Sequence, residues 1–502
     1  MRKYEFPFAP RLSKGLSSVS MVKVKGRGFD RLSPNGSKQS VKGVDDMRLA
    51  AAFLASAAML AAAPVHARPA DAATAKQILM DSVAIPTVEG RGKVPVLAAY
   101  YAGVLKAAGY SDADIEITPI GETATFAATL QGTTKAKPIL LLGHMDVVEA
   151  DPKDWTRDPF VPVEENGYIF GRGSEDNKFD VAMMVATMAE LKREGFKPKR
   201  SIILLLSGDE ETSMTTTRAL AAKYKDAEFA LNGDGGGGLI GEDGKAKYYG
   251  LQAGEKTYAD YGLEVTNPGG HSSRPGAVNA IVELSEALAK VGAYRFTPQQ
   301  NELTKVGMPI VADQVGGDIG AALKAFAADP TDAKAIATIR ADPEYVGQIG
   351  TTCVPTLVKG GHAENALPQR ATANINCRIF PGVSSEAVRA ELEKVIGDPA
   401  VKVNMDPDAT ASDASPLRPD VVAAVTKTVH ARFPGLPIIP SMSAGATDSL
   451  HFRAVGVPSY GVAGLFSKAS DSFAHGLNER APVAAIPGAL AHWDSLLRDL
   501  SK

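Results

Sequence analysis

The chain has 502 residues, with 54 Lys and Arg against 57 Asp and Glu, and 45% of its residues are hydrophobic. This length exceeds what one compact core supports, so we expect two domains. The net charge of −3 gives no basic excess, which argues against nucleic acid as a partner and leaves an ordinary globular protein.

The N-terminal segments differ from the rest of the chain. Residues 1–46 carry ten Lys or Arg against four Asp or Glu with no apolar period, so we expect a disordered segment or a mis-called N-terminal extension. Residues 47–67 have a basic start, an apolar Ala/Leu stretch and a small-x-Ala site, which is the pattern of a signal peptide. Because the stretch is short for a bilayer, we expect export to the periplasm or medium without stable membrane insertion.

Helical and extended patterns alternate after the signal peptide. Apolar spacing predicts helices over residues 73–82, 94–108, 178–194 and 215–224. The segments "IEITPI", "TFAATLQG", "PILLLGHMDVV", "SIILLLS" and "FALNGD" read as strands. Such alternation predicts an α/β layer with a mostly parallel sheet, in which functional groups gather at the carboxyl ends of strands.

Acidic and histidine clusters follow those predicted strands. They comprise His144 with Asp146, then Asp176, then the triplet Asp209, Glu210 and Glu211, and finally Asp234. Singly, each has a structural explanation, such as a helix N-cap, a core histidine or a turn. Four such clusters in succession favour a metal site, since zinc binds His nitrogen and carboxylate oxygen and two-metal sites need a bridging carboxylate. A second histidine ligand is then expected later in the chain.

A second domain is predicted over residues 257–411. Its strand and helix patterns follow the order β-α-β-β-α-β, which is ferredoxin-like, and an alanine-rich, helix-prone insertion interrupts them over about 298–344. Cys353 and Cys377 are the two cysteines of the chain and flank a strand–turn–strand pattern. They either form a disulfide in an oxidising compartment or remain unpaired core thiols.

Eight ordered segments resemble the M20 family of zinc metallopeptidases, which contains carboxypeptidases, dipeptidases, aminoacylases and other deacylases. The segments are "GHMDVV", "GRGSEDNK", "DEE", "GGHSSRP", "GGHAENALP", "CRIFPG", "GATDS" and "HGLNER". The resemblance extends over residues 73–491. The helical insertion resembles the larger, Gly-X carboxypeptidase-type branch of the family.

This resemblance implies two Zn²⁺ per subunit, with Co²⁺ or Mn²⁺ as substitutes. His144 and Asp234 would bind one ion, Glu211 and His475 the other, and Asp176 would bridge them. His475 is then the second histidine that the metal chemistry requires. Family members often have a cis peptide bond after the bridging aspartate.

Catalytic and substrate-binding roles follow from the same resemblance. Asp146 would orient a ligand histidine, and Glu210 would be the general base toward metal-activated water. His271 of the second domain would reach a neighbouring active site and hydrogen-bond the developing oxyanion. The substrate carboxylate would be held by Asn365, Arg378, Ala446 and Thr447. Asp209 is expected to be only a turn residue.

The expected fold is therefore α/β, with a mostly parallel-sheet catalytic domain and an inserted ferredoxin-like α+β lid and dimerisation domain. The catalytic domain is expected over 73–256 and 412–502, the lid over 257–411, and a homodimer through the lid. The expected function is that of an exported dizinc metallocarboxypeptidase or dipeptidase, cleaving small peptides beside a free carboxylate. Alternatives are an N-acyl amino acid hydrolase (aminoacylase or deacylase) and a non-catalytic binding relative.

Overall fold

A computed structural model describes residues 70–405 and 409–502. All of them belong to one unit of the chain, His66–Lys502. The expected N-terminal extension (1–46) and signal peptide (47–67) lie outside the described residues. No helix among the described residues is long and apolar enough to cross a membrane.

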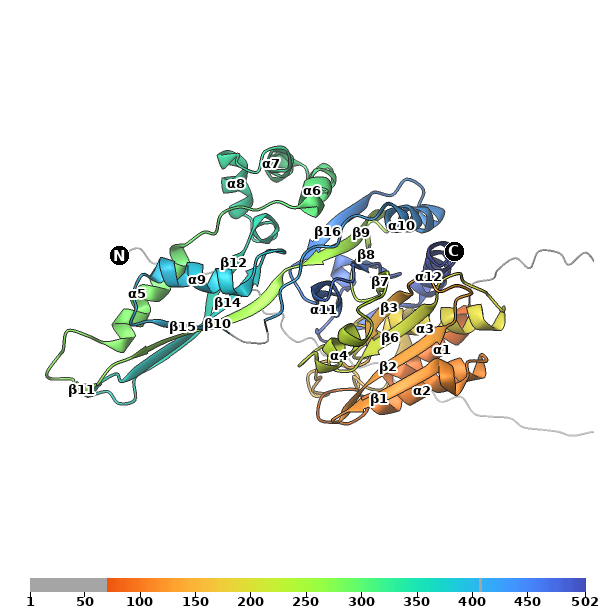
Figure 1. Cartoon of the computed structure of the whole chain (residues 1–502), viewed down its shortest axis with the longest axis horizontal. Coiled ribbons are helices and arrows are strands. Elements are labelled where there is room, and N and C mark those ends of the chain that lie inside the picture. The colour runs from red at the N-terminus through yellow and green to blue at the C-terminus, as the bar shows by residue number, and fades with distance from the viewer. Residues whose placement is uncertain (1–69, 406–408) are drawn as a thin grey trace, which may run out of the picture. The chain divides into compact units, whose positions relative to one another are not determined.

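A ten-stranded sheet forms the centre of the fold (Figure 1), in the order β1-β2-β6-β3-β7-β17-β9-β8-β18, with β16 paired to β9. The neighbours β6, β3, β7 and β17 are parallel, and five of the nine pairings in the sheet are parallel. The strands are β1 Ile115–Ile120, β2 Thr123–Leu130, β3 Ile139–His144, β6 Ile202–Ser207, β7 Phe229–Asn232, β8 Gly237–Ile240, β9 Ala246–Glu255, β16 Ile438–Ser443, β17 Ser459–Gly461 and β18 Phe466–Lys468.

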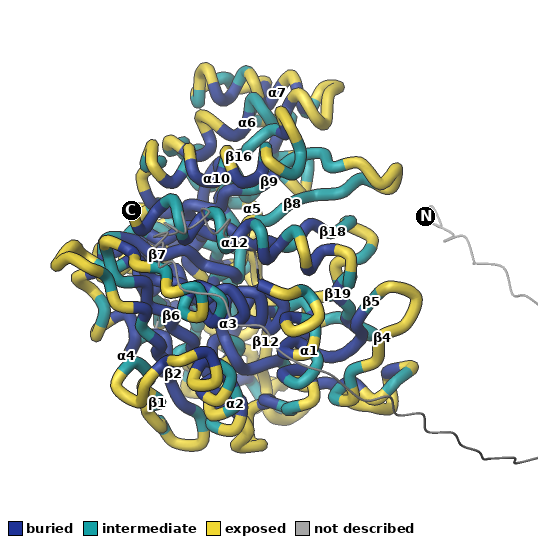
Figure 2. Tube along the Cα trace, turned by 90° about the vertical axis from the view of Figure 1, so that its right-hand side faces the viewer, coloured by how far each residue is buried: buried dark blue, intermediate teal, exposed yellow. Residues whose placement is uncertain are grey.

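Strands β3 and β6 are buried along their whole length because helices cover both faces of the sheet. On β3, Ile139 and Leu141 belong to the larger apolar core, whereas Leu140 and Leu142 belong to a second core on the opposite face. Most residues of β6 and α3 are buried and are drawn dark blue in Figure 2. The helices of this layer are α1 Ala72–Val83, α2 Val94–Ala107, α3 Lys178–Arg193, α4 Thr215–Lys223, α10 Pro419–Arg432, α11 Ser449–Ala454 and α12 Ile486–Leu500.

A separate antiparallel sheet has the order β12-β14-β10-β15 and its own apolar core. With α5 and α9 it follows the β-α-β-β-α-β sequence that was predicted as ferredoxin-like. Its elements are β10 Thr257–Thr266, α5 Ala280–Ala293, β12 Thr352–Gly360, β14 Arg370–Ile379, α9 Ser385–Ile396 and β15 Lys402–Met405, with a small ribbon of β11 Gly270–His271 and β13 Ala366–Leu367.

Three α-helices occupy the stretch that was expected to be a helix-prone insertion. They are α6 Glu302–Val315, α7 Gly317–Ala328 and α8 Ala333–Arg340. A further small sheet pairs β19 Arg480–Pro482 with β5 Tyr168–Phe170 and β5 with β4 Val163–Glu165. The remaining short elements are η1 Asp112–Asp114, η2 Val346–Ile349, η3 Ala469–Asp471 and η4 Val483–Ala485.

Cys353 and Cys377 form a disulfide. They lie directly opposite each other in the register of β12 and β14. Of the two alternatives that the sequence left open, the structure therefore has the bridged one.

Candidate metal centre

The four predicted clusters meet at the carboxyl ends of central strands of the large sheet. His144 is the last residue of β3, Asp209 to Glu211 follow β6, and Asp234 follows β7. These three strands are parallel neighbours, so their carboxyl ends lie side by side. Asp176 joins them from the loop that precedes α3.

Asp176 lies between two histidines. Its Oδ1 is 2.9 Å from His144 Nε2, and its Oδ2 is 3.3 Å from His475 Nε2. His475 Nε2 is also 2.9 Å from the carboxylate of Glu211. One carboxylate thus contacts two imidazoles through its two oxygens, which is the arrangement that a bridging ligand requires.

The donor set fits divalent cations. Two overlapping groups that share His144 have ligand atoms within 4.8 Å of one another, His144 with Glu210 and Asp234, and His144 with Asp176 and Glu211. Among the described residues, every ion pair of Asp176, Glu211 and Asp234 involves His144 or His475. Nitrogen and carboxylate oxygen suit Zn²⁺, and several adjacent carboxylates without Lys or Arg partners favour bound cations.

Asp146 contacts His144 through its backbone carbonyl and the two glutamates through its side chain. Its carbonyl oxygen lies 3.0 Å from His144 Nδ1, which leaves His144 Nε2 facing Asp176. Its carboxylate accepts backbone N–H bonds from Glu210 at 3.1 Å and Glu211 at 3.0 Å. The sequence predicted that Asp146 would hydrogen-bond a ligand histidine, and its carbonyl makes that contact, while its carboxylate lies 3.6 Å from His144 Nδ1. The carboxylate mainly fixes the two glutamates.

The predicted turn role of Asp209 is confirmed. Its carboxylate accepts backbone N–H bonds from Thr215 at 2.8 Å and Thr216 at 2.9 Å, at the start of α4. The acidic triplet therefore divides into one residue that caps a helix and two glutamates near the histidines. The peptide bond between Asp176 and Asn177 is cis, as the family resemblance predicted.

Glu479 is a fully buried acid that sequence reasoning did not select. It accepts a hydrogen bond from Arg172 Nη1 at 2.6 Å. It also accepts backbone N–H bonds from Gly173, Glu175 and Asp176, at 2.9, 2.8 and 3.0 Å. Glu479 therefore holds the loop that carries Asp176. Its position in "HGLNER", four residues after His475, was the available signal.

Burial and close neighbours shift the pKa values of these residues. Burial raises the pKa of Glu210 well above its usual value, although His144 opposes the shift. Burial would also raise the pKa of Asp176, but hydrogen bonds from His144 and His475 outweigh it and lower that pKa. The hydrogen bond to Asp176, followed by that to Glu211, raises the pKa of His475 to about 10. Binding of a cation would displace protons from such a cluster.

The residues expected to bind substrate lie on other elements. His271 is exposed on β11, and its Nδ1 accepts a bond of 3.1 Å from Ser273 N. Asn365 lies beside it, since its carbonyl accepts a bond of 3.0 Å from Ser272 N. In the described part of the chain, neither side chain has a recorded contact with His144, Asp176 or His475.

Arg378 does reach the loop that contains Ala446 and Thr447. Its Nη1 donates to the carbonyl of Ala444 at 2.9 Å. Ala446 is half-buried, whereas Thr447 is buried and donates its hydroxyl to Glu255 at 2.6 Å. The side chain of Thr447 is thus occupied within the fold, which leaves its backbone and that of Ala446 as the groups of this loop suited to a ligand.

We expect Glu479→Gln to lower the free energy of unfolding by about 3 kcal/mol, because it leaves the buried Arg172 without its charge partner. Urea unfolding measures the change. The matched control is Glu165→Gln, which breaks a more exposed pair with Arg157 and should cost less than about 1 kcal/mol. Equal losses in the two variants would contradict the role given to Glu479.

Comparison with known proteins agrees with this geometry. Residues 140–499 match the sequence profile described as "Peptidase family M20/M25/M40". A probable carboxypeptidase S-like 2 of Dictyostelium discoideum is 31% identical over 286 residues, which are 53% of each chain. The match therefore spans about half the length of that relative.

Two further relatives cover more of the chain. The N-fatty-acyl-amino acid synthase/hydrolase PM20D1 of Xenopus tropicalis is 28% identical over 376 residues, 70% of each chain. The crystal structure of the M20 family metallo-carboxypeptidase Sso-CP2 from Sulfolobus solfataricus superposes with a TM-score of 0.65 at 18% identity. That superposition covers 85% of this chain and 98% of the other, and it supports the fold.

Proposed function

The chain belongs to the peptidase family M20/M25/M40, and from that premise we propose that it is an exported dizinc hydrolase. It cleaves a peptide or amide bond beside a free C-terminal carboxylate, as a metallocarboxypeptidase or dipeptidase. The observation that carries the proposal is the position of the Asp176 carboxylate between His144 and His475, with two glutamates beside them.

The proposed ligands divide between two ions. His144 and Asp234 would hold one zinc, Glu211 and His475 would hold the other, and Asp176 would be their shared ligand. The distances from His144 Nε2 to Asp234, 3.9 Å, and from His475 Nε2 to Glu211, 2.9 Å, support this division. When bound, the ions polarise the scissile carbonyl and lower the pKa of water.

Glu210 is proposed as the general base. Its carboxylate lies near His144 and Asp234, and Asp146 fixes its backbone. It takes a proton from the attacking water and delivers it to the leaving amine. Without metal, burial raises the pKa of Glu210, and bound cations would lower it, which leaves the carboxylate ionised and able to accept a proton.

Arg378 is proposed to hold the substrate carboxylate together with Asn365 and the backbone around Ala446 and Thr447. Its planar guanidinium matches both carboxylate oxygens, and its bond to Ala444 places it at that loop. His271 is proposed to hydrogen-bond the developing oxyanion.

Incubation of zinc-loaded protein with dipeptides, Gly-X substrates and N-acyl amino acids tests the proposed function. We expect release of the C-terminal amino acid. No turnover of any substrate, with two zinc ions bound per chain, would leave the non-catalytic binding alternative.

An N-acyl amino acid hydrolase is the second candidate. It is favoured by the relative from Xenopus tropicalis, whose printed name is that of an N-fatty-acyl-amino acid synthase/hydrolase and whose match covers 70% of both chains. Both candidates cleave an amide bond next to a carboxylate, so the same residues serve them. The relative rates in the substrate assay distinguish the two.

We also propose that residues 257–411 form a lid and that two chains pair through it, while residues 73–256 and 412–502 form the catalytic domain. Strand β12 is an edge strand, with Val354, Leu357 and Val358 exposed by 55%, 62% and 67%. Ile281 and Val282 on the neighbouring α5 are also exposed. An apolar sheet edge of this kind is suited to pairing with a second copy.

Mixing two inactive variants tests whether lids are exchanged. His271→Ala removes the proposed oxyanion donor, and Glu210→Gln removes the base. A mixed dimer should contain one site with both groups intact, so we expect up to about a quarter of wild-type activity to return after exchange of subunits. Activity measured before and after mixing reports this, and no recovery in verified mixed dimers would show that each lid serves its own chain.

The proposed export rests on the signal-peptide pattern of residues 47–67. The disulfide between Cys353 and Cys377 supports it, because such bonds persist in oxidising compartments. Mass spectrometry of the secreted protein should find a mature N-terminus close to Arg68. A mature N-terminus far upstream would contradict processing at this site.

A further inference from the structure

A pocket of about 530 Å³ lies between the helical insertion and the large sheet. Its roof is formed by α6 and α7, with Leu303, Met308, Val311 and Leu323 among the lining residues. Its floor is formed by β8, β9 and β16. The volume is in the range of pockets that enclose a whole small ligand, and is more than one amino-acid side chain fills.

Glycine makes the floor of this pocket unusually open. Tyr249 and Leu251 of β9 point into the main core, so Tyr248, Gly250 and Gln252 face the pocket. Gly250 has no side chain, and a Cβ added there would meet no other residue's atom closer than 3.6 Å. Gly236 and, on the neighbouring strand β8, Gly237 and Gly238 also line the pocket. The centre of the floor is therefore bare backbone.

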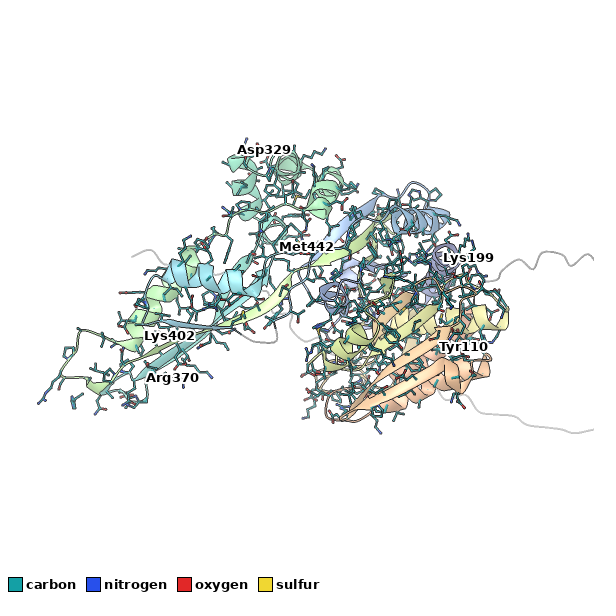
Figure 3. The ribbon with its side chains drawn as sticks, viewed as in Figure 1. Tyr110, Lys199, Asp329, Arg370, Lys402 and Met442 are labelled. Atoms are coloured by element: carbon teal, nitrogen blue, oxygen red, sulfur yellow. A yellow bond between two sulfur atoms is a disulfide. The ribbon has the colours of Figure 1, made fainter. Side chains whose placement is uncertain are left out.

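The roof is a packed structure. A Cβ at Gly307 of α6 would lie 2.2 Å from the carbonyl oxygen of Pro440, so this glycine lets α6 rest directly on β16. Met308 and Leu323 belong to the buried apolar cluster of the insertion. Met442 of β16, labelled in Figure 3, also lines the pocket. The insertion thus encloses apolar space over the sheet.

Two of the residues that line the pocket lie close in sequence to proposed metal ligands. Gly236 lines it two residues after Asp234, and Ser472 lines it three residues before His475. Both segments therefore run directly from the pocket wall to a proposed ligand.

The Gln252 end of β9 is the end nearest the substrate-binding loop. Gln252 donates to Glu255 at 2.8 Å, and Glu255 accepts the hydroxyl of Thr447. At the other end, Tyr248 lies near the exposed Glu344, whose charge adds to burial in raising the pKa of Tyr248. The pocket thus extends from the Gln252 side of β9 to the exposed Glu344.

We propose that this pocket takes the acyl chain of an N-acyl amino acid substrate, with Gly250 leaving room for the chain. The inference rests on the second candidate function, that of an N-acyl amino acid hydrolase, and specifies its substrate class. From Tyr248 to Gln252 the floor is about 13 Å long, the length of an extended chain of about ten carbons. No amino-acid side chain is that long, and only two of the lining residues, Glu344 and Lys468, are charged.

Gly250→Leu should fill the middle of the pocket. For wild-type protein acting on N-acyl-leucines of 2 to 16 carbons, we expect kcat/KM to rise about two- to fourfold per methylene up to about ten carbons and then level off. In the variant, the ratio of decanoyl to acetyl rates should fall at least about 30-fold. Val311→Trp, which fills the pocket from the roof, should lower the same ratio and covers the case that Gly250→Leu does not fold.

Gly262→Leu is the matched control. Gly262 also lies within a strand, β10, and a Cβ there meets nothing closer than 3.9 Å, but it does not line the pocket. Its chain-length profile should equal that of the wild type. The proposal would be overturned if folded Gly250→Leu kept the wild-type dependence of kcat/KM on acyl length. It would also be overturned if the variant changed only its preference for the C-terminal side chain of the substrate.

Calorimetry of N-decanoyl-leucine binding to metal-free protein separates the pocket from catalysis. We expect binding that weakens at least about tenfold in Gly250→Leu and not in Gly262→Leu. Such binding without turnover of N-decanoyl-leucine by zinc-loaded wild type would keep the pocket and reject the N-acyl amino acid hydrolase candidate. Turnover that does not depend on acyl length would keep the function and reject the pocket.

Discussion

Glu210→Gln should retain two zinc ions per chain and lose about 10³-fold of kcat, whereas Glu211→Gln should lose close to one zinc ion. The two neighbours differ in their partners. Glu211 lies 2.9 Å from His475 and is proposed to bind a cation, while Glu210 has no ion pair among the described residues and is proposed to accept a proton. General-base catalysis contributes about 10² to 10⁴ in rate, so its removal has a large effect on kcat.

Mass spectrometry for metals and steady-state kinetics on the same preparations measure both effects. Both backbones are fixed by Asp146, so a single amide substitution should leave the local structure intact. The exposed Glu165→Gln serves as the control for loss of one carboxylate. Equal metal loss in the two variants would show that the roles of Glu210 and Glu211 are wrongly assigned.

Asp176→Asn should remove most of both metals and more than about 10³-fold of activity. Its two oxygens face His144 and His475 separately, so an amide would replace one of the two oxygens that the bridge needs. The zinc content should fall from two to well below one per chain, measured after dialysis against a weak chelator. The loop should stay folded, because Glu479 holds its backbone.

Asp154→Asn is the matched control, since Asp154 is an exposed aspartate outside the centre. It should keep both zinc ions and full activity. Loss of only one zinc ion from Asp176→Asn would mean that Asp176 belongs to a single site and does not bridge.

The strands that position the centre were predictable because their signal is local. The aliphatic runs that became β3 and β6 are too apolar for any place but a covered sheet, and the polar residues after them therefore had to lie at its edge. Asp209 was also readable as a turn residue, because its helix-capping partners follow within seven residues.

Contacts between distant parts of the chain were not predictable in the same way. Glu479 acquires its role from Arg172, which lies 307 positions away, and the position of Glu479 in "HGLNER" does not reveal that partner. Similarly, the carbonyl of Asp146, and not its carboxylate, makes the short contact with His144, which depends on the turn after β3. The disulfide depended on the register of β12 against β14, so the sequence left both alternatives open.

Residues of the proposed substrate site illustrate the same limit. The hydroxyl of Thr447 is directed into the fold by Glu255, which lies 192 positions earlier. The pocket beside Gly250 likewise exists only because α6 packs on β16, and the run of glycines after Asp234 gave no hint of it.

Anomalous diffraction at the zinc absorption edge, from crystals of zinc-loaded protein, tests the central claim most directly. Two peaks about 3.5 to 4 Å apart are expected. One should contact His144 and Asp234, the other His475 and Glu211, with Asp176 touching both. A single peak, or two peaks that do not share Asp176, would contradict it.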